Sequence, residues 1–313
     1  MGDPSGVGPE VIAGALAALP PSARTGLCVV GDGAVMARAA RLVGATLGFG
    51  EGCGAVPLVP VALADRATIV DGAISAAGGE AAYRAVARAV ELALSGAIDA
   101  IVTAPLNKAA LHAAGHRYDG HTELLAKLTG AKGSFMLLAS DKLASIHVST
   151  HVSLLEATRR ATTTRVLATI QAGHAHFREL GLAEPRIAVA GLNPHCGEGG
   201  LFGREELDEI NLAVEMAKGE GIVVSGPLPA DTVFHRALKV EFDLVVAQYH
   251  DQGHIPTKLV AFDETVNVTL GLPVRRTSVD HGTAFDIAWK GLARPTNMLA
   301  AIAYARRMVA CAG

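Results

Sequence analysis

A repeated unit of a short apolar run, a polar loop and an alanine-rich segment with helical spacing constrains the fold of this chain more than any other feature. The apolar runs cover residues 27–30, 98–103, 143–150, 187–192 and 244–249. Each leads into a polar loop. Such units are typical of βα repeats around a mostly parallel sheet, so the sequence predicts an α/β fold.

Helices are expected after several of these strands. Residues 79–94 and 296–310 are rich in alanine with helical spacing, and a further helix is expected from about residue 205 to 218. Ser153 and Glu156 have the spacing of a capping box, which predicts that another helix begins there.

The length of 313 residues exceeds what one ordinary core supports, so two lobes are expected. We expect residues 1–125 and 285–313 to form the first lobe and residues 126–284 the second. No proline- and serine-rich linker marks these boundaries.

The composition excludes several classes of function. Half of the residues are hydrophobic and the net charge is −3, which indicates a compact protein without a basic surface for nucleic acid. The four cysteines lack CxxC spacing, so neither a zinc ribbon nor a disulfide framework is expected, and a reducing cytoplasm suits them. The sequence shows no secretion signal and no run of about 18 apolar residues, so no membrane partner is expected.

Three histidines lie just beyond the ends of apolar runs: His151, His195 and His250. The carboxyl ends of parallel strands border the ligand site in open α/β sheets, and three imidazoles suit a catalytic Zn²⁺, Co²⁺ or Ni²⁺. The alternative is three separate loop histidines bonded to backbone. His147 lies within a strand, roughly 13 Å along the chain from His151, so we expect it to be a packed or hydrogen-bonded neighbour.

Two glycine-rich loops, residues 2–10 and 197–203, match neither the Rossmann fingerprint nor the P-loop. Glycine still lets backbone N–H groups approach an anion, although a plain tight turn explains each loop equally well.

Lys258, Asn267 and Arg276 stand in a mainly apolar loop-and-strand stretch after His250. Together they suit a phosphate clamp, whereas solvated surface charges are the alternative. Alternation along a strand would place Arg275 and Arg276 on opposite faces, so only one of them can point into a site.

Long stretches of the chain resemble the 4-hydroxythreonine-4-phosphate dehydrogenase family of vitamin B6 biosynthesis. The matching stretches, in order, are GDPSGVGPE (2–10), GHTELLA (120–126), HVSTHVSLLEA (147–157), GLNPHCGEGGLFGREE (191–206), GPLPADTVF (226–234), YHDQGHIPTK (249–258) and NVTLGLPVRRTSVDHGTAFDIA (267–288).

This resemblance implies an isocitrate/isopropylmalate dehydrogenase-like α/β/α fold and a homodimer with its active site between the lobes, completed by the partner subunit. It also implies NAD as cofactor and a divalent metal (Zn, Co, Mn or Mg) on His151, His195 and His250, the last from the other subunit. NAD would lie near residues 191–200 and 277–283, with Asn193, Gly197 and Gly199 as contacts.

The substrate contacts implied by the resemblance are His121, Thr122, Lys258, Asn267 and Arg276. The implied reaction is oxidation, with decarboxylation, of a 4-phosphorylated 3-hydroxy acid such as 4-phosphooxy-L-threonine. Asp231 and Asp251 are candidate proton acceptors or carboxylates that orient a ligand, a role that ion-paired loop aspartates would mimic.

The sequence departs from the family in two places. The family leads us to expect a short apolar strand before Gly2, so the start is expected to be truncated or misassigned. His254 stands where biosynthetic members have leucine, as in a sister group that oxidises 4-phospho-D-threonate or 4-phospho-D-erythronate to dihydroxyacetone phosphate and CO₂.

Three other functions use some of the same residues. A zinc hydrolase would also use three histidines, a phosphometabolite-binding protein would need no catalysis, and relatives that oxidise dihydrodiols would need no phosphate clamp.

Overall fold

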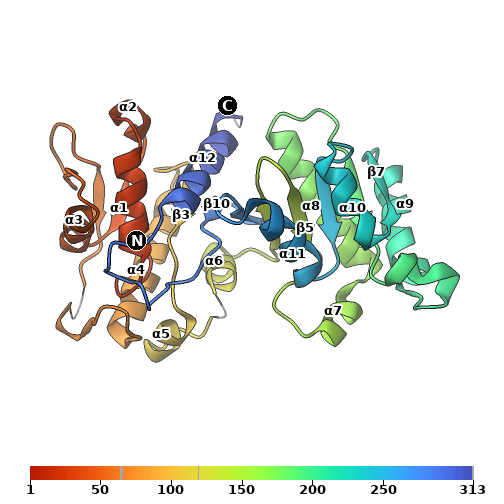
Figure 1. The fold of residues 1–313 in the computed structure, drawn as a ribbon, viewed down its shortest axis with the longest axis horizontal. Coiled ribbons are helices and arrows are strands. Elements are labelled where there is room, and N and C mark those ends of the chain that lie inside the picture. Colours follow the sequence, from red (N-terminus) through yellow and green to blue (C-terminus); the bar gives the residue numbers. More distant parts are fainter. Residues whose placement is uncertain (64–65, 119, 312–313) are drawn as a thin grey trace. The chain divides into compact units, whose positions relative to one another are not determined.

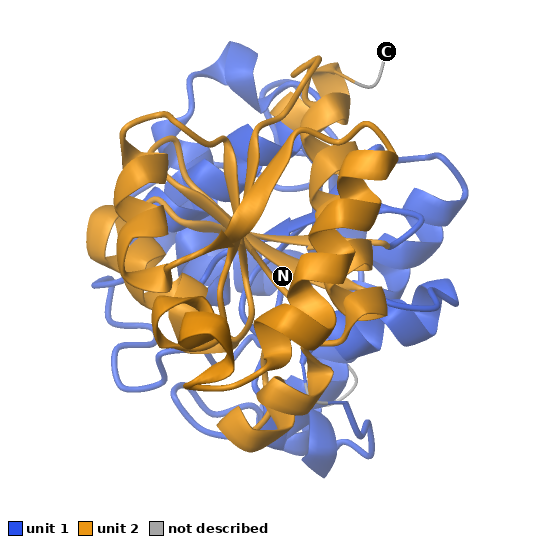
Figure 2. Ribbon diagram, turned by 90° about the vertical axis from the view of Figure 1, so that its right-hand side faces the viewer, with its two compact units in different colours: residues 1–133, 272–306 blue, residues 134–271, 307–313 orange. Residues whose placement is uncertain are grey.

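The computed structural model in Figure 1 describes residues 1–63, 66–118 and 120–311. The chain divides into two compact units (Figure 2): unit 1 contains Met1–Gly133 and Leu272–Arg306, and unit 2 contains Ser134–Gly271 and Arg307–Gly313. None of the helices described combines the length and the apolar character needed to cross a membrane.

Unit 1 has two pairs of parallel strands, β1 with β2 and β3 with β10. Its core lies between α1, the loop after β10 and α12, where Val7, Val11, Val279, Met298 and Ile302 are buried together. The elements are α1 (Gly8–Ala18), α2 (Pro21–Arg24), β1 (Val29–Gly31), α3 (Gly33–Leu42), β2 (Leu58–Pro60), η1 (Arg66–Thr68), α4 (Ala76–Leu94), β3 (Ala100–Thr103), α5 (Lys108–Ala113), α6 (His121–Thr129), β10 (Arg275–Ser278) and α12 (Thr296–Ala310), whose last turn belongs to unit 2.

Unit 2 has six strands in the order β9-β4-β5-β8-β6-β7. β5, β8, β6 and β7 run parallel, whereas β4 is antiparallel to both β5 and β9. The elements are β4 (Phe135–Ala139), β5 (Ala144–His147), α7 (Leu154–Arg160), α8 (Thr163–Glu179), β6 (Ile187–Ala190), η2 (Pro194–Gly200), η3 (Glu206–Ile210), α9 (Asn211–Gly219), β7 (Val224–Leu228), α10 (Ala230–Leu238), β8 (Leu244–Ala247), α11 (His250–Ala261) and β9 (Val266–Leu270).

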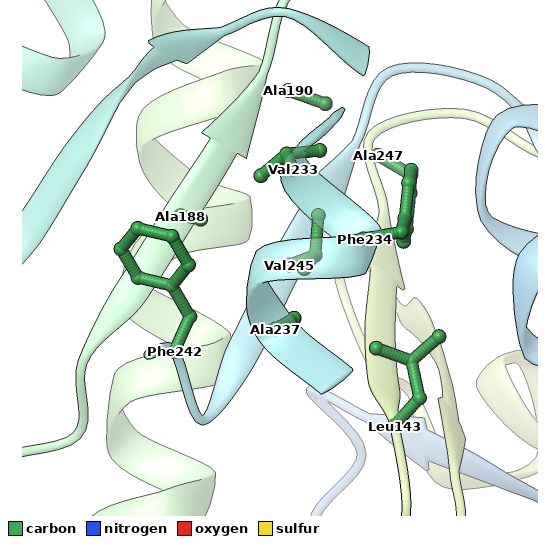
Figure 3. Close-up of a cluster of buried hydrophobic side chains, with 9 residues drawn as sticks. All are labelled: Leu143, Ala188, Ala190, Val233, Phe234, Ala237, Phe242, Val245 and Ala247. Atoms are coloured by element: carbon green, nitrogen blue, oxygen red, sulfur yellow. The ribbon is translucent and has the colours of Figure 1, made fainter. Parts of the chain in front are cut away.

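A cluster of buried side chains attaches α10 to the sheet of unit 2. Figure 3 shows Val233 and Phe234 of α10 beside small residues of the parallel strands, among them Ala188 of β6 and Val245 of β8. Small side chains on the strands let the helix pack closely against the sheet. Helices packed in this way cover the faces of a parallel sheet.

The predicted α/β class and the five predicted strands are confirmed, although each strand is shorter than its apolar run. The helices at residues 79–94 and 296–310 are present as α4 and α12. Ser153 caps α7 as expected, since its side chain accepts a hydrogen bond from the backbone N–H of Glu156 at 3.2 Å.

One prediction is wrong. The polar loop expected after residues 244–249, with His250 and Gly253 in it, is a helix instead, because α11 begins at His250. Gly253 is a packing residue within this helix: a Cβ there would stand 2.4 Å from Nε2 of His147. Pro256 is the seventh residue of this helix and has no backbone N–H, so it cannot donate to the carbonyl of Gln252. Lys258 therefore lies on a helix too.

Candidate metal and substrate site

The three candidate metal ligands follow three neighbouring parallel strands. β8 pairs with β5 on one side and with β6 on the other, in parallel register. His151, His250 and His195 come after β5, β8 and β6 respectively. Because parallel strands end at the same edge of a sheet, the three histidines follow the strands at one edge of the unit 2 sheet, as the sequence predicted.

His151 and His250 are neighbours within one chain, with ring centroids 5.8 Å apart. Nδ1 of His250 donates to Oδ1 of Asp251 at 2.7 Å, which leaves Nε2 of His250 to face a ligand. A carboxylate in this position fixes the tautomer and orientation of a metal-binding imidazole. Asp251 is therefore engaged with His250 in this structure.

Within residues 1–63, 66–118 and 120–311 of one chain, no group of three or more histidine, cysteine, aspartate or glutamate side chains gathers closely enough to hold a metal. The imidazole donors fit a borderline divalent metal, but one chain in this conformation does not assemble all three around one point.

A second pair of histidines packs behind His250. The ring of His254 stacks on that of His250, with centroids 3.6 Å apart and planes at 14°. Nδ1 of His254 lies 3.1 Å from Nε2 of His147 and 3.0 Å from the carbonyl oxygen of His250. His254, the residue that departs from the biosynthetic pattern, thus contacts His250, a candidate metal-binding residue.

The protonation of this pair follows from its partners. Nδ1 of His147 faces the carbonyl of Met136 at 3.1 Å, so it donates, and Nε2 of His147 must accept from Nδ1 of His254. Burial lowers the pKa of His147 to about 4 and that of His254 to about 3. Both rings are neutral at pH 7, and His147 is the hydrogen-bonded neighbour that the sequence predicted.

His195 lies in a left-handed turn. Residues 195–199 all have positive φ, and three of them are not glycine: His195 at 51°, Cys196 at 55° and Glu198 at 43°. Left-handed backbone costs about 1 kcal/mol for each residue with a side chain, so the turn stores about 3 kcal/mol. Surrounding contacts must offset this cost.

The candidate cofactor contacts Asn193 and Gly197 help to build this turn. The side-chain amide of Asn193 donates to Glu205 at 2.7 Å and to Glu206 at 2.9 Å. Gly197 has φ +79°, and a Cβ on it would stand 2.8 Å from the carbonyl oxygen of Gly203. Gly199 is exposed, and a Cβ there would meet nothing within 4 Å.

Asp231 is exposed in the first turn of α10. Its charge acts on the His195 turn: burial, together with the charges of Glu206 and Asp231, raises the pKa of the Cys196 thiol. Asp231 is therefore close enough to influence groups beside His195.

Three of the candidate substrate residues, His121, Thr122 and Arg276, lie in unit 1. Arg276 is 2% exposed, and its Nε and Nη2 donate to Oγ1 of Thr103 at 3.2 and 2.8 Å. Burial lowers the pKa of Arg276 to about 9, which leaves the guanidinium charged at neutral pH. Arg275 is half-buried and both arginines lie in β10, in line with the predicted alternation of their side chains along a strand.

His121 and Thr122 are the first two residues of α6, where the helix dipole favours negative charge. Burial and the charge of Arg276 lower the pKa of His121 well below its ordinary value. Its Nε2 is buried and has no hydrogen-bond partner in the described part of the chain. A neutral imidazole with an unsatisfied nitrogen beside a buried cation is a ready acceptor for a ligand hydroxyl.

The other two candidate substrate residues, Lys258 and Asn267, lie in unit 2. Lys258 is half-buried on α11 with its ammonium 6.0 Å from the ring centroid of Phe262, and Asn267 is half-buried on β9. The candidate substrate residues are thus divided between the two units.

Sequence reasoning missed Thr103 and Glu206. Thr103 ends an apolar run and is the hydroxyl that holds Arg276, so its position at a strand end was a usable signal. Glu206 is buried at 1% exposure against the His195 turn, and only its place in the GREE stretch distinguished it.

An α/β fold with histidines after parallel strands, and a buried arginine and histidine beside a helix N-terminus, are features that α/β proteins use to bind small anions. The chain belongs to the family described as pyridoxal phosphate biosynthetic protein PdxA, whose sequence profile matches residues 24–305.

Individual relatives match along nearly their whole length. A D-threonate 4-phosphate dehydrogenase from Cupriavidus necator is 49% identical over 96% of this chain and 93% of its own. A 4-hydroxythreonine-4-phosphate dehydrogenase from Geobacter metallireducens is 48% identical over 100% of this chain and 95% of its own. The crystal structure of a 4-hydroxythreonine-4-phosphate dehydrogenase from Klebsiella pneumoniae superposes with a TM-score of 0.89 at 43% identity, covering 99% of this chain and 96% of that one.

Proposed function

We propose that the protein is an NAD- and divalent-metal-dependent dehydrogenase that oxidises the 3-hydroxyl of a 4-phosphorylated four-carbon acid, with loss of CO₂. The observation that carries the proposal is the position of His151, His250 and His195 after three adjacent parallel strands. The names of the relatives at 49% and 48% identity support the substrate class.

The residues that would hold the metal are His151, His195 and His250, with Asp251 orienting His250 through the 2.7 Å hydrogen bond. NAD would contact the Asn193 to Gly199 stretch. When bound, the metal would stabilise negative charge on the substrate oxygen and NAD would accept the hydride.

The substrate phosphate would be held by groups of this chain that favour an anion. Arg276 supplies a buried positive charge with fixed orientation, since Thr103 accepts from two of its nitrogens. His121 and Thr122 supply the N-terminus of α6. We assign Lys258 and Asn267 to the same substrate. Asp231, exposed and close to the His195 turn, is our candidate proton acceptor.

The active enzyme is proposed to be a homodimer in which His250 serves the site of the partner subunit. α11 supports this assembly, because it continues from His250 into an exposed apolar stripe: Ile255 is 56%, Leu259 80% and Phe262 70% exposed. The spacing of four and three residues places these side chains on one face of a helix. Apolar surface of this kind favours burial against a second copy.

The substrate is proposed to be 4-phosphooxy-L-threonine or 4-phospho-D-threonate (or 4-phospho-D-erythronate). The second choice has a specific observation in its favour, since His254, which distinguishes the sister group, stacks directly on His250. A residue that contacts His250, a candidate metal-binding residue, is well placed to change which substrate the site accepts.

The test is a panel of these phosphorylated acids with NAD and added Zn²⁺, Co²⁺, Mn²⁺ or Mg²⁺, scored for NADH and CO₂. We expect NADH and CO₂ in equal amounts with at least one acid. Metal-dependent hydrolysis without NAD would show that the protein is a hydrolase and contradict the proposal. Equal turnover of the dephosphorylated acids would contradict the assignment of a phosphate clamp.

A further inference from the structure

The backbone between β6 and the His195 turn is clamped by buried side chains at four consecutive positions. The carbonyl of Ala190 accepts from Nε2 of Gln248, and the carbonyl of Gly191 accepts from Nε2 of Gln252, both at 2.8 Å. The next two backbone N–H groups, those of Leu192 and Asn193, both donate to Oε1 of Glu206, at 2.8 and 2.7 Å.

Glu206 holds this stretch from the far side of the turn. Its second oxygen accepts from Nδ2 of Asn193 at 2.9 Å, so one buried carboxylate fixes both the backbone and the side chain of the residue where the turn begins. A Cβ on Gly197 would stand 2.9 Å from the same oxygen, which shows how closely the turn is wrapped around the carboxylate.

A left-handed turn with three side-chain-bearing residues does not form by local preference, since right-handed backbone is favoured at each of them. The hydrogen bonds to Glu206 are the contacts that offset this preference, because charge-assisted bonds to a buried carboxylate are among the strongest in a protein. His195, two residues after Asn193, takes its position from this arrangement.

We propose that Glu206 is a positioning residue that shapes the left-handed turn and thereby sets the place of the His195 imidazole, with Gln248 and Gln252 fixing the same backbone to the helix that carries His250. This inference rests on the proposed function, in which His195 is a metal ligand. Glu206 would act through the turn, by its hydrogen bonds to Leu192 and Asn193.

The test is the affinity of the purified full chain for Co²⁺, followed by the visible absorption of the bound ion. In Glu206→Gln, the new amide cannot satisfy all three donors, because turning its oxygen to the backbone N–H groups points its NH₂ at Nδ2 of Asn193. Loss of a group that orients a metal ligand weakens binding about 10- to 100-fold, and we expect a loss in this range.

Glu205→Gln is the matched control. Glu205 accepts from the same amide of Asn193 at 2.7 Å but makes no hydrogen bond to the backbone of the turn. Glutamine at this position can present its oxygen to Asn193, so Co²⁺ affinity should stay at the wild-type value. Equal losses in both variants would overturn the inference, since they would show that the loss does not depend on the hydrogen bonds that Glu206 makes to the backbone of Leu192 and Asn193.

His195→Ala separates the inference from the proposed function. If His195→Ala loses Co²⁺ while Glu206→Gln binds it as wild type does, the positioning role is wrong and the metal site stands. If His195→Ala binds Co²⁺ like the wild type, the proposed metal site fails, and the inference fails with it.

Thermal unfolding establishes that each variant is folded at the temperature of the titration. If Glu206→Gln does not fold, Gly203→Ala replaces it, because a Cβ there would stand 2.5 Å from Nδ2 of Asn193 at φ +139° and would push Asn193 away from Glu206. Weakened Co²⁺ binding in folded Gly203→Ala supports the inference, and unchanged binding contradicts it.

Discussion

Replacing Arg276 with lysine tests the phosphate clamp most directly. Arg276 is 2% exposed and held by two of its nitrogens on Thr103, so its guanidinium has one orientation. Lysine keeps the charge but loses the planar fork that forms parallel hydrogen bonds to a phosphate.

The size of the effect follows from the bonds that lysine cannot make. One charge-assisted hydrogen bond is worth about 2 kcal/mol, and a factor of ten corresponds to about 1.4 kcal/mol, so Arg276→Lys should raise the KM for a phosphorylated acid about 30-fold. The KM for the dephosphorylated acid should change little.

Steady-state kinetics on the phosphorylated acid and its dephosphorylated analogue measures this difference. Arg275→Lys is the matched control, because Arg275 is the neighbouring arginine on the other face of β10 and is only half-buried. It should leave both KM values unchanged. An equal rise for both substrates in Arg276→Lys would refute the assignment of Arg276 to the phosphate.

Three further predictions follow from other parts of the structure. His151→Ala and His250→Ala chains are each expected to be inactive alone, but co-expression should recover roughly a quarter of wild-type activity if His250 serves the partner's site. The reason is that about half of the dimers are mixed and each mixed dimer has one intact site. No recovery in verified mixed dimers would assign His250 to the site of its own chain. Gly253→Ala should lower the free energy of unfolding in urea by about 1–3 kcal/mol, because the new Cβ would stand 2.4 Å from Nε2 of His147; unchanged stability would contradict this packing. Burial lowers the pKa of His176 to about 4, below its unfolded value near 6.5, so the unfolded state binds the proton more readily and stability is lost as pH falls from 6.5 towards 4. His176→Gln should reduce the slope of unfolding free energy against pH in that window, and an unchanged slope would show that His176 does not contribute.

Local sequence patterns were enough to predict the strands and the position of the histidines at the strand ends. Apolar runs mark β5, β6 and β8 because a parallel strand is buried on both faces, and the residue after such a run lies at the sheet edge. The alternation of Arg275 and Arg276 was readable for the same local reason.

Features that depend on distant contacts were not readable. Gly253 suggests a loop by itself, and only the ring of His147, more than a hundred residues earlier, shows why glycine stands within α11. The left-handed conformation of His195 and Cys196 is equally invisible in the sequence, because neither residue favours it and the side chains that impose it come from η3 and from the β8–α11 junction.

The helix α11 has one further consequence. His250, His254 and Lys258 recur every fourth residue on one face, while Ile255, Leu259 and Phe262 share another. If His250 and Lys258 serve the proposed site and the exposed apolar face docks on a second copy, the helix would transmit to the site any tilt that the second copy imposes. Substitutions at Leu259, which is 80% exposed in the single chain, should therefore behave like damage to the active site, and dilution of the enzyme should lower its turnover per chain.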